Sequence, residues 1–335
     1  MNAFDKLFNI YSRDDTLVKD NKFAEFTIRK TIVEHPSFKD ALKKITQIHQ
    51  RGLNAKVPGG LLITGQTGSG KTTLIEFYRD HFPQRNEPDR TVTPVLVVTT
   101  PESPTVKNLA EAILIALGDP AAASGTAENK TRRIYKYLKE CKVELIIVDE
   151  FQHFYDSNKI SQAKRVADWL KLVFNIAAIP VVLVGLPRSI MVVRMNPQLK
   201  RRFSAPFYLK PFGYETENES KEFRGVLKKI HSEIPLKCPE LHEANLARRF
   251  FYASCGLIDY VAKIIDRAVF IAGENNRSAL TLKDFSIAFQ EEVWRDVPKK
   301  LNPFNEKAIF RPLTKLGEPF EIWDDPDQYK SKGTE

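Results

Sequence analysis

The sequence has 335 residues, and at roughly 150 residues per domain this length predicts about two domains. Hydrophobic residues make up 42% and charged residues 28%, values typical of globular proteins, so a collagen-like fibre, a disordered tail protein and a membrane bundle are excluded. The longest apolar stretch, 176–186, contains Pro180 and is shorter than the ~20 residues of a bilayer span. We expect neither a transmembrane helix nor a signal peptide, and a cytoplasmic location.

The charge is unevenly distributed along the chain. Basic residues exceed acidic ones by 51 to 42, and the net charge of +9 suits an anionic partner. Six bases and two acids occupy 127–142, and five bases with no acid occupy 194–210, whereas the last eighteen residues carry six acids and two bases. The three cysteines form no CxxC pair and the histidines lack metal-ligand spacing, so we expect neither disulfides nor structural zinc.

Apolar periodicity predicts the elements in chain order. A helix begins at Ser37, because apolar side chains recur at helical spacing from Phe38 to Ile48. A strand at 61–64, a glycine-rich turn and a helix at 71–79 follow. Further apolar strands alternate with helical segments, which predicts a parallel sheet covered by helices on both faces. The strands are 95–99, 145–148 and 181–184, and the helical segments are 105–117, 127–141 and 162–177.

After Gly213 the pattern changes, and only helices are predicted up to about Arg295, which indicates a small helical domain. These helices are 215–232, 240–253, 257–271 and 281–293. Beyond Pro298 no period is sustained, so we expect a tail or an extended arm. Its aromatic residues suit docking onto a partner protein, and ordinary disorder is the alternative. They are Phe304, Phe310, Phe320 and Trp323.

A phosphate-binding motif lies between the strand at 61–64 and the helix at 71–79. It fits G-x-x-x-x-G-K-[ST], and this context makes the motif credible. The glycines let backbone N–H groups converge on phosphates, Lys71 reaches the β- and γ-phosphates, and the Thr72 hydroxyl ligates Mg²⁺. A purely structural turn would not need this lysine and threonine. The expected ATP-binding residues are Gly65, Gln66, Thr67, Gly68, Ser69, Gly70, Lys71, Thr72 and Thr73.

Two acids follow the apolar strand at 145–148. Asp149 is expected to hold hydrated Mg²⁺, and Glu150 to polarise the attacking water. An apolar strand that ends in acids is common, but this one follows Lys71 by 78 residues, which leaves room for one more strand and two helices. Glu150 favours a hydrolase, since a small-molecule kinase would not need it. His153, close to the acidic pair, is the one histidine of interest.

Together these motifs resemble the AAA+ ATPases, and further segments narrow the match to the transposon ATPases TniB and TnsC. Those segments are 118–120, 149–153, 196–203, 255–268 and 301–304, and the resemblance extends from about His35 to Phe304. It implies a phosphate loop on the central strand, a helical lid, and ATP-dependent assembly into rings or filaments around duplex DNA. It also implies a regulator that links target selection to a DDE transposase.

The resemblance and the pattern of elements together predict four parts of the chain. They are an N-terminal segment and helix (1–50), an AAA+ nucleotide-binding α/β domain (51–213), a helical lid domain (214–295) and a C-terminal tail (296–335).

The resemblance also assigns an arginine finger, which a neighbouring subunit inserts at the γ-phosphate, to Arg201 or Arg202. A solvated basic turn or a DNA contact is the alternative for these arginines, and their spacing does not decide between them. The strand at 181–184 ends without the usual sensor Asn or Thr, and Asp259 stands near the position of a sensor arginine. These two departures imply slow hydrolysis, which suits a switch better than a motor.

A basic stripe marks the helix at 127–141. Arg132, Lys136 and Lys139 fall within about 60° on a helical wheel, opposite Ile134 and Leu138. Repetition of this stripe in a ring or spiral would track the DNA backbone without sequence specificity, and a solvated basic face is the alternative. The expected DNA contacts are Lys130, Arg132, Lys136 and Lys139.

The sequence thus favours an AAA+ ATPase that uses ATP and Mg²⁺, oligomerises on duplex DNA and regulates transposition. Its expected partners are sequence-nonspecific duplex DNA, further copies of itself, a transposase and a target-selector protein, with no membrane. Two alternatives stay open: a replication or repair loader that acts on a helicase or clamp, and a scaffold that binds ATP without useful turnover.

Overall fold

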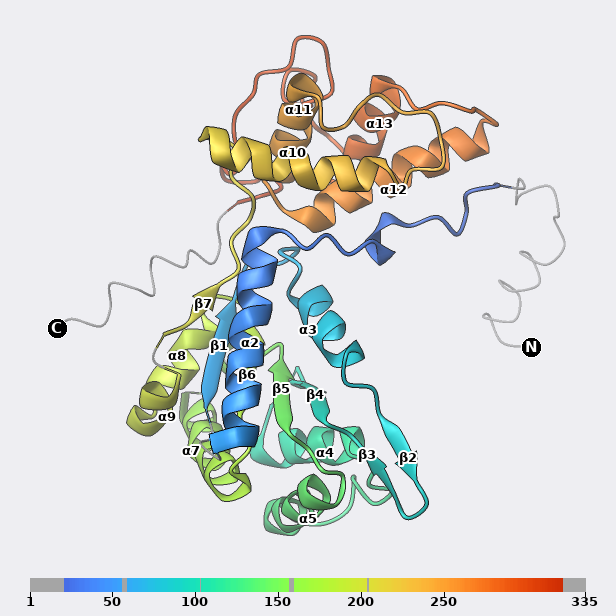
Figure 1. The fold of residues 1–335 in the computed structure, drawn as a ribbon. Helices are drawn as coiled ribbons and strands as arrows, with labels where there is room; N and C mark the ends of the chain where they lie inside the picture. The colour runs from blue at the N-terminus through green and yellow to red at the C-terminus, as the bar shows by residue number, and fades with distance from the viewer. Residues whose placement is uncertain (1–20, 56–58, 103, 157–159, 204, 322–335) are drawn as a thin grey trace, which may run out of the picture. The chain divides into compact units, whose positions relative to one another are not determined.

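The computed structural model describes residues 21–55, 59–102, 104–156, 160–203 and 205–321 (Figure 1). These residues form two compact units, an α/β unit at 34–211 and a helical unit built from 21–33 and 212–321. Across the described ranges, every helix is too short or too polar to span a bilayer.

Five parallel strands form the sheet of the α/β unit (Figure 1). In spatial order they are β4 (Val95–Thr99), β5 (Leu145–Asp149), β6 (Val181–Gly185), β1 (Gly60–Thr64) and β7 (Phe207–Tyr208). Thr64 lies opposite Gly185 and Thr99 opposite Asp149, so these strands end at one edge of the sheet. The predicted parallel sheet is confirmed. The expected central position of β1 is wrong, because β6 occupies the centre and β1 lies between β6 and β7.

Helices cover both faces of this sheet, because strand side chains point alternately to either face. Leu61 and Ile63 pack against one pair of helices, whereas Leu62 packs against three others. The pair is α2 (Pro36–Ala55) and α3 (Lys71–Asp80), and the three are α4 (Val106–Ala116), α5 (Ala127–Glu140) and α7 (Ile160–Ala177). Apolar periodicity predicts all five of these helices.

Several short elements are not predicted by the sequence pattern. They are the strand β7, the antiparallel hairpin β2 (Arg85–Glu87) and β3 (Arg90–Val92), the 3₁₀ helix η1 (Ile28–Lys30), and the helices α6 (His153–Asp156), α8 (Ser189–Arg194) and α9 (Pro197–Arg202). The hairpin is mostly exposed and buries only Val92, so it has no apolar alternation. The helices are too short to display a period. The start of α9 is nevertheless fixed locally, because the Asn196 side chain accepts the N–H groups of Gln198 and Leu199 at 2.9 and 3.1 Å.

Four predicted helices form most of the helical unit. They are α10 (Glu217–His231), α11 (Ala244–Ser254), α12 (Ile258–Glu274) and α13 (Leu282–Glu292). Their shared core contains the fully buried rings of Phe223, Phe250, Phe285 and Phe289. α10 and α13 each begin with a capping box, so local sequence defines where these two helices start.

The segment 21–33 belongs to the helical unit. Its 3₁₀ helix η1 (Ile28–Lys30) lies against α12, where the Asp266 carboxylate accepts the Thr27 hydroxyl and the Ile28 N–H, both at 2.7 Å. α2 instead belongs to the α/β unit. The segment expected at 1–50 is therefore divided between the two units within its described part.

The segment after α13 also packs into the helical core. Phe304 is 2% exposed, and its ring centroid lies 5.1 Å from that of Phe250 and 5.7 Å from that of Phe285. Phe320 packs edge-on against Tyr260, with the centroids 4.9 Å apart. These two aromatic residues of the expected tail are part of the unit's own core, which leaves them unavailable for docking onto a partner. Trp323 lies outside the described residues.

Candidate functional site

The glycine-rich loop begins where β1 ends, and its backbone geometry explains its glycines. Gly68 and Gly70 have φ angles of 79° and 89°, in the left-handed region that residues with a Cβ rarely adopt. Glycine is required at position 65 for a different reason, the close approach of other atoms. A Cβ there would lie 2.6 Å from Ser69 Oγ and 2.8 Å from the Leu209 carbonyl oxygen. The loop is therefore closed tightly over the end of the sheet.

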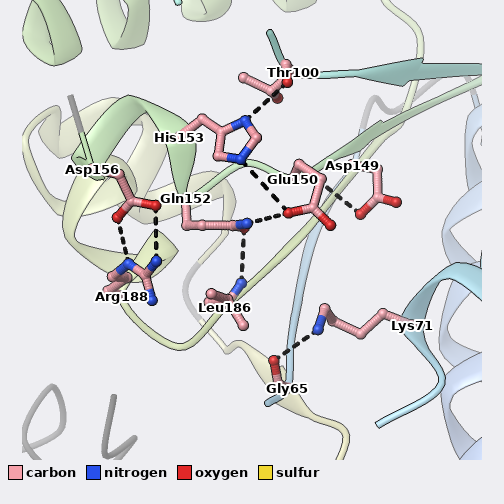
Figure 2. Close-up of polar contacts among 10 residues, drawn as sticks. All are labelled: Gly65, Lys71, Thr100, Asp149, Glu150, Gln152, His153, Asp156, Leu186 and Arg188. Atoms are coloured by element: carbon pink, nitrogen blue, oxygen red, sulfur yellow. Dashed lines mark hydrogen bonds and ion pairs between the residues drawn. The ribbon is translucent and has the colours of Figure 1, made fainter. Parts of the chain in front are cut away.

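The polar groups around this loop fit a phosphate. Gly70 is the N-cap of α3 and supplies no side-chain hydrogen bond, so the first N–H groups of the helix lack a cap side chain. The Ser69 hydroxyl oxygen is buried and has no hydrogen-bond partner among the described residues. Lys71 is only 8% exposed, and its Nζ donates to the carbonyl oxygen of Gly65 at 2.9 Å (Figure 2) and to that of Gln66, also at 2.9 Å. A cation, a buried hydroxyl and a helix N-terminus are thus gathered at one loop.

Asp149 ends β5 on the same edge of the sheet. Its backbone carbonyl accepts the Thr100 N–H at 2.9 Å, which fixes its position beside the end of β4. The residue is 7% exposed, and burial raises the pKa of its carboxyl, a shift that the nearby Lys71 ammonium opposes. A buried carboxylate of this kind would be stabilised by a cation placed next to it.

These residues also fit Mg²⁺. Thr72 is exposed on the first turn of α3, and Asp149 supplies the carboxylate. Among the described residues, His, Cys, Asp and Glu side chains form no group of three or more that could enclose a metal. Mg²⁺ does not require one, since it is usually held by one or two protein oxygens together with water and substrate phosphates.

Glu150 directly follows Asp149 and has an unusual backbone. Its φ is 54°, a left-handed value, and its N–H donates to Asp149 Oδ1 at 2.8 Å. Two neighbours contact its Oε2 (Figure 2): Gln152 donates through Nε2, and His153 Nε2 lies 3.9 Å away. His153 is held in turn by the Thr100 carbonyl, 3.0 Å from its Nδ1. The sequence singles out His153. Gln152 lies in the segment 149–153 that carries the family resemblance, but that resemblance assigns no role to this neutral amide.

The two candidate finger arginines on α9 have different surroundings. Arg201 is exposed. Arg202 is half-buried, its Nη2 donates to the Ile179 carbonyl at 3.2 Å, and burial lowers the pKa of its guanidinium. Arg202 is therefore anchored in its own subunit, whereas Arg201 holds its charge at the surface.

The four expected DNA contacts on α5 do not form one group. Arg132, Lys136 and Lys139 are exposed. Lys130 is fully buried, and its ammonium donates to Glu111 Oε2 at 3.0 Å and to the Ala122 carbonyl. The expectation that Lys130 contacts DNA is therefore corrected: this lysine has a structural role inside the α/β unit. The spacing contained this signal, because Lys130 precedes the buried Ile134 by four residues and lies on the same face of the helix.

Comparison with known proteins gives one family and one fold. The family model described as "TniB: Bacterial TniB protein" matches residues 24–214. No curated protein matches the sequence.

Several solved structures share the fold at low sequence identity. The Aeropyrum pernix ORC2 protein, solved as ADPNP–ADP complexes, has 16% identity and a TM-score of 0.59, with 82% of this chain and 72% of that chain covered. Cdc6p from Pyrobaculum aerophilum has 13% identity and a TM-score of 0.60, with coverages of 85% and 73%. The Aeropyrum pernix ORC1 protein in complex with DNA has 16% identity and a TM-score of 0.55, with coverages of 76% and 64%. The fold is that of the P-loop AAA+ ATPases.

Proposed function

The chain belongs to the family of bacterial TniB proteins, and from this membership we propose that it is an ATP-dependent regulator of DNA transposition. It binds and hydrolyses ATP with Mg²⁺, oligomerises on duplex DNA and activates a DDE transposase in response to a target-selector protein. One observation carries the proposal. The phosphate loop with Lys71 follows β1, Asp149 ends β5 and Glu150 comes directly after it, so the groups that an ATPase site requires lie at one edge of the sheet.

Different residues of the chain have different roles in the proposed hydrolysis. The loop from Gly65 to Thr73 binds the nucleotide through its N–H groups, and Lys71 neutralises phosphate charge. Thr72 and Asp149 hold Mg²⁺, which supplies positive charge at the phosphate oxygens when it is bound. Glu150 orients the attacking water and receives its proton. The rate then depends on how firmly each group is held, because phosphoryl transfer is mainly positioning and electrostatics.

Oligomerisation completes the site in this proposal. Arg201 is the arginine that reaches a neighbouring subunit's γ-phosphate, because its charge is exposed while Arg202 bonds its own subunit. Hydrolysis then requires assembly, which suits a regulator that must respond to its target.

The proposed DNA contacts are the three exposed bases of α5. Arg132, Lys136 and Lys139 would bind phosphates, so the contact would not depend on base sequence. The ORC1 protein, whose fold this chain shares, was solved in complex with DNA, and this is consistent with a DNA partner for the chain.

Electron microscopy of the full chain with duplex DNA and a slowly hydrolysed ATP analogue tests the proposal. We expect ordered rings or filaments for the wild type and for Lys39→Ala, a control that removes an exposed lysine from α2. Lys71→Ala should lose both ATP binding and assembly, because phosphate charge loses its counter-charge. Unchanged ATP affinity in Lys71→Ala would refute the nucleotide site, and ATP binding by the wild type without turnover or assembly would favour a scaffold.

A further inference from the structure

Gln152 is a buried polar residue that the nucleotide motifs leave unexplained. It is 3% exposed and lies between Glu150, which follows β5, and Leu186, which follows β6 (Figure 2). Its Oε1 accepts the Leu186 N–H at 3.0 Å, and its Nε2 donates to Glu150 Oε2. The backbone N–H can only donate and the carboxylate can only accept, so these two partners fix which way the amide faces.

The amide of Gln152 fits beside β6 because residue 185 is a glycine. A Cβ at Gly185 would lie 2.6 Å from Gln152 Oε1 and 2.4 Å from Ser189 Oγ, closer than such atoms approach. The neighbouring backbone is also tied down, since the Phe151 N–H donates to the Val184 carbonyl at 2.9 Å. The position of Gln152 is therefore set from both strands.

Glu150 needs such support. Its side chain is 37% exposed, and a flexible carboxylate at this exposure has no fixed direction without a hydrogen bond. Within the described part of the chain, its carboxylate contacts run through Oε2. This arrangement leaves Oε1 to accept from water. The end of β6 supplies no side chain for this support, because the residues that follow Val184 are Gly185, Leu186 and Pro187, and their side chains carry no hydrogen-bonding group.

We propose that Gln152 is a positioning residue for ATP hydrolysis, which directs the Glu150 carboxylate and ties it to the Leu186 backbone. The inference rests on the proposed ATPase function. With Gln152 in this role, the rate of turnover depends on the position of the loop between β6 and α8, because a shift of the Leu186 N–H moves the amide and hence the carboxylate. The same loop is tied to α6, where Arg188 Nη2 donates to Asp156 Oδ2 at 2.8 Å.

Kinetics of four full-length variants with duplex DNA test the inference. Gln152→Met keeps the length of the side chain and loses both hydrogen bonds. Gln152→Glu keeps the acceptor for Leu186 and loses the donor to Glu150. Glu150→Gln removes the carboxylate, and the double variant Glu150→Gln/Gln152→Met shows whether the two effects are coupled. Gln50→Met, at an exposed position of α2, is the matched control.

We expect both Gln152 variants to lower kcat by about tenfold or more, part of the contribution that a positioned general base makes. KM and the affinity for a fluorescent ATP analogue should stay within about twofold, because the hydrogen bonds of the amide run to Glu150 and Leu186. In the Glu150→Gln background, Gln152→Met should change nothing further, since the group that it positions is gone.

Other outcomes identify which idea fails. A wild-type kcat in both Gln152 variants, with Glu150→Gln impaired, overturns the positioning role and leaves the ATPase intact. Unimpaired turnover in Glu150→Gln overturns the proposed role of Glu150 itself. Effects that add in the double variant, or that lower ATP affinity as much as kcat, make Gln152 a structural residue. Should Gln152→Met fail to fold, Gln152→Glu carries the same comparison.

Discussion

Arg201 and Arg202 differ in exposure although they are adjacent, and the difference predicts different defects. Arg201→Ala should lower DNA-stimulated hydrolysis by at least about tenfold, because a finger in trans contributes strongly to the transition state. Mixing it with Lys71→Ala subunits should restore part of the activity, since some interfaces then combine an intact Lys71 with an intact Arg201. The measurement is ATP turnover of the mixture against each variant by itself.

Arg202→Ala is the matched control for this experiment. It removes the hydrogen bond to Ile179 and should lower the free energy of unfolding more than Arg201→Ala does. A mixture of Arg201→Ala and Lys71→Ala subunits that co-assembles but gains no activity would contradict a finger at Arg201.

His35, just before α2, predicts a pH dependence of stability. Burial lowers its pKa from 6.5 to about 4. The unfolded chain therefore binds the proton more readily, and this contribution to the free energy of unfolding falls as the pH drops from about 6.5 towards 4. The loss between pH 7.5 and 4.5 should be about 2 kcal/mol. Urea unfolding of the wild type and of His35→Gln at both pH values measures it, and an equal pH response in the two proteins would exclude His35 as the cause.

At the scale of an element, α5 has both exposed and buried basic residues, and we expect their replacement to have different effects. Replacing Arg132, Lys136 and Lys139 together by Gln should weaken binding to every DNA sequence. It should also make the salt dependence shallower, by roughly one unit of log–log slope for each phosphate that the helix no longer binds. The fold should survive, since exposed substitutions usually cost within about 0.5 kcal/mol each. Fluorescence anisotropy with duplex DNA over a salt series measures both effects.

Lys130→Gln serves as the contrasting variant on the same helix. It leaves the surface charge of α5 intact and breaks the buried contacts with Glu111 and the Ala122 carbonyl, so it should lower stability. An unchanged salt slope in the triple variant would show that the stripe is a solvated face, and the basic segment 194–210 would then be the next candidate.

α5 also shows what the sequence can and cannot predict about an element. The helix itself follows from apolar spacing, because Ile134 and Leu138 are buried as expected. Helical spacing also places Lys130 on the buried face, but it does not indicate the groups that accept its ammonium, Glu111 Oε2 and the Ala122 carbonyl, because both lie outside the helix. The same limit applies to Gln152, whose partner Leu186 follows a different strand. Local patterns locate elements, motifs and buried faces, whereas contacts with other segments decide which groups pair there and how a side chain is positioned.

At the scale of the whole molecule, the helical unit depends on a segment whose sequence predicts only a tail. Phe304→Ala should lower the free energy of unfolding by about 3 kcal/mol or more, because it empties a site among buried phenylalanine rings. Leu316→Ala, in the same segment but 88% exposed, should cost less than about 0.5 kcal/mol. Denaturant unfolding measures both. Equal stability of the two variants would contradict a structural role for Phe304.

The same unit shows why whole-molecule organisation is harder to predict than its elements. Apolar periodicity predicts all four of its long helices, but both flanking segments lack a sustained period. Asp266 binds Thr27 across 239 positions, and Arg249 Nη1 donates to the Pro303 carbonyl at 2.6 Å. Such interactions are specified jointly by two distant segments, so neither segment predicts them by itself.

The close approach of Gly185 and Gln152 has a consequence for the family's history. A side chain at 185 would displace the amide at 152 from its present position, because even a single carbon atom at 185 would lie 2.6 Å from the amide oxygen. Family members that acquired a larger residue at 185 should therefore have a shorter one at 152. Each such pair of changes would have to pass through an intermediate that is either crowded or lacks support for Glu150, so the two positions should evolve together and rarely.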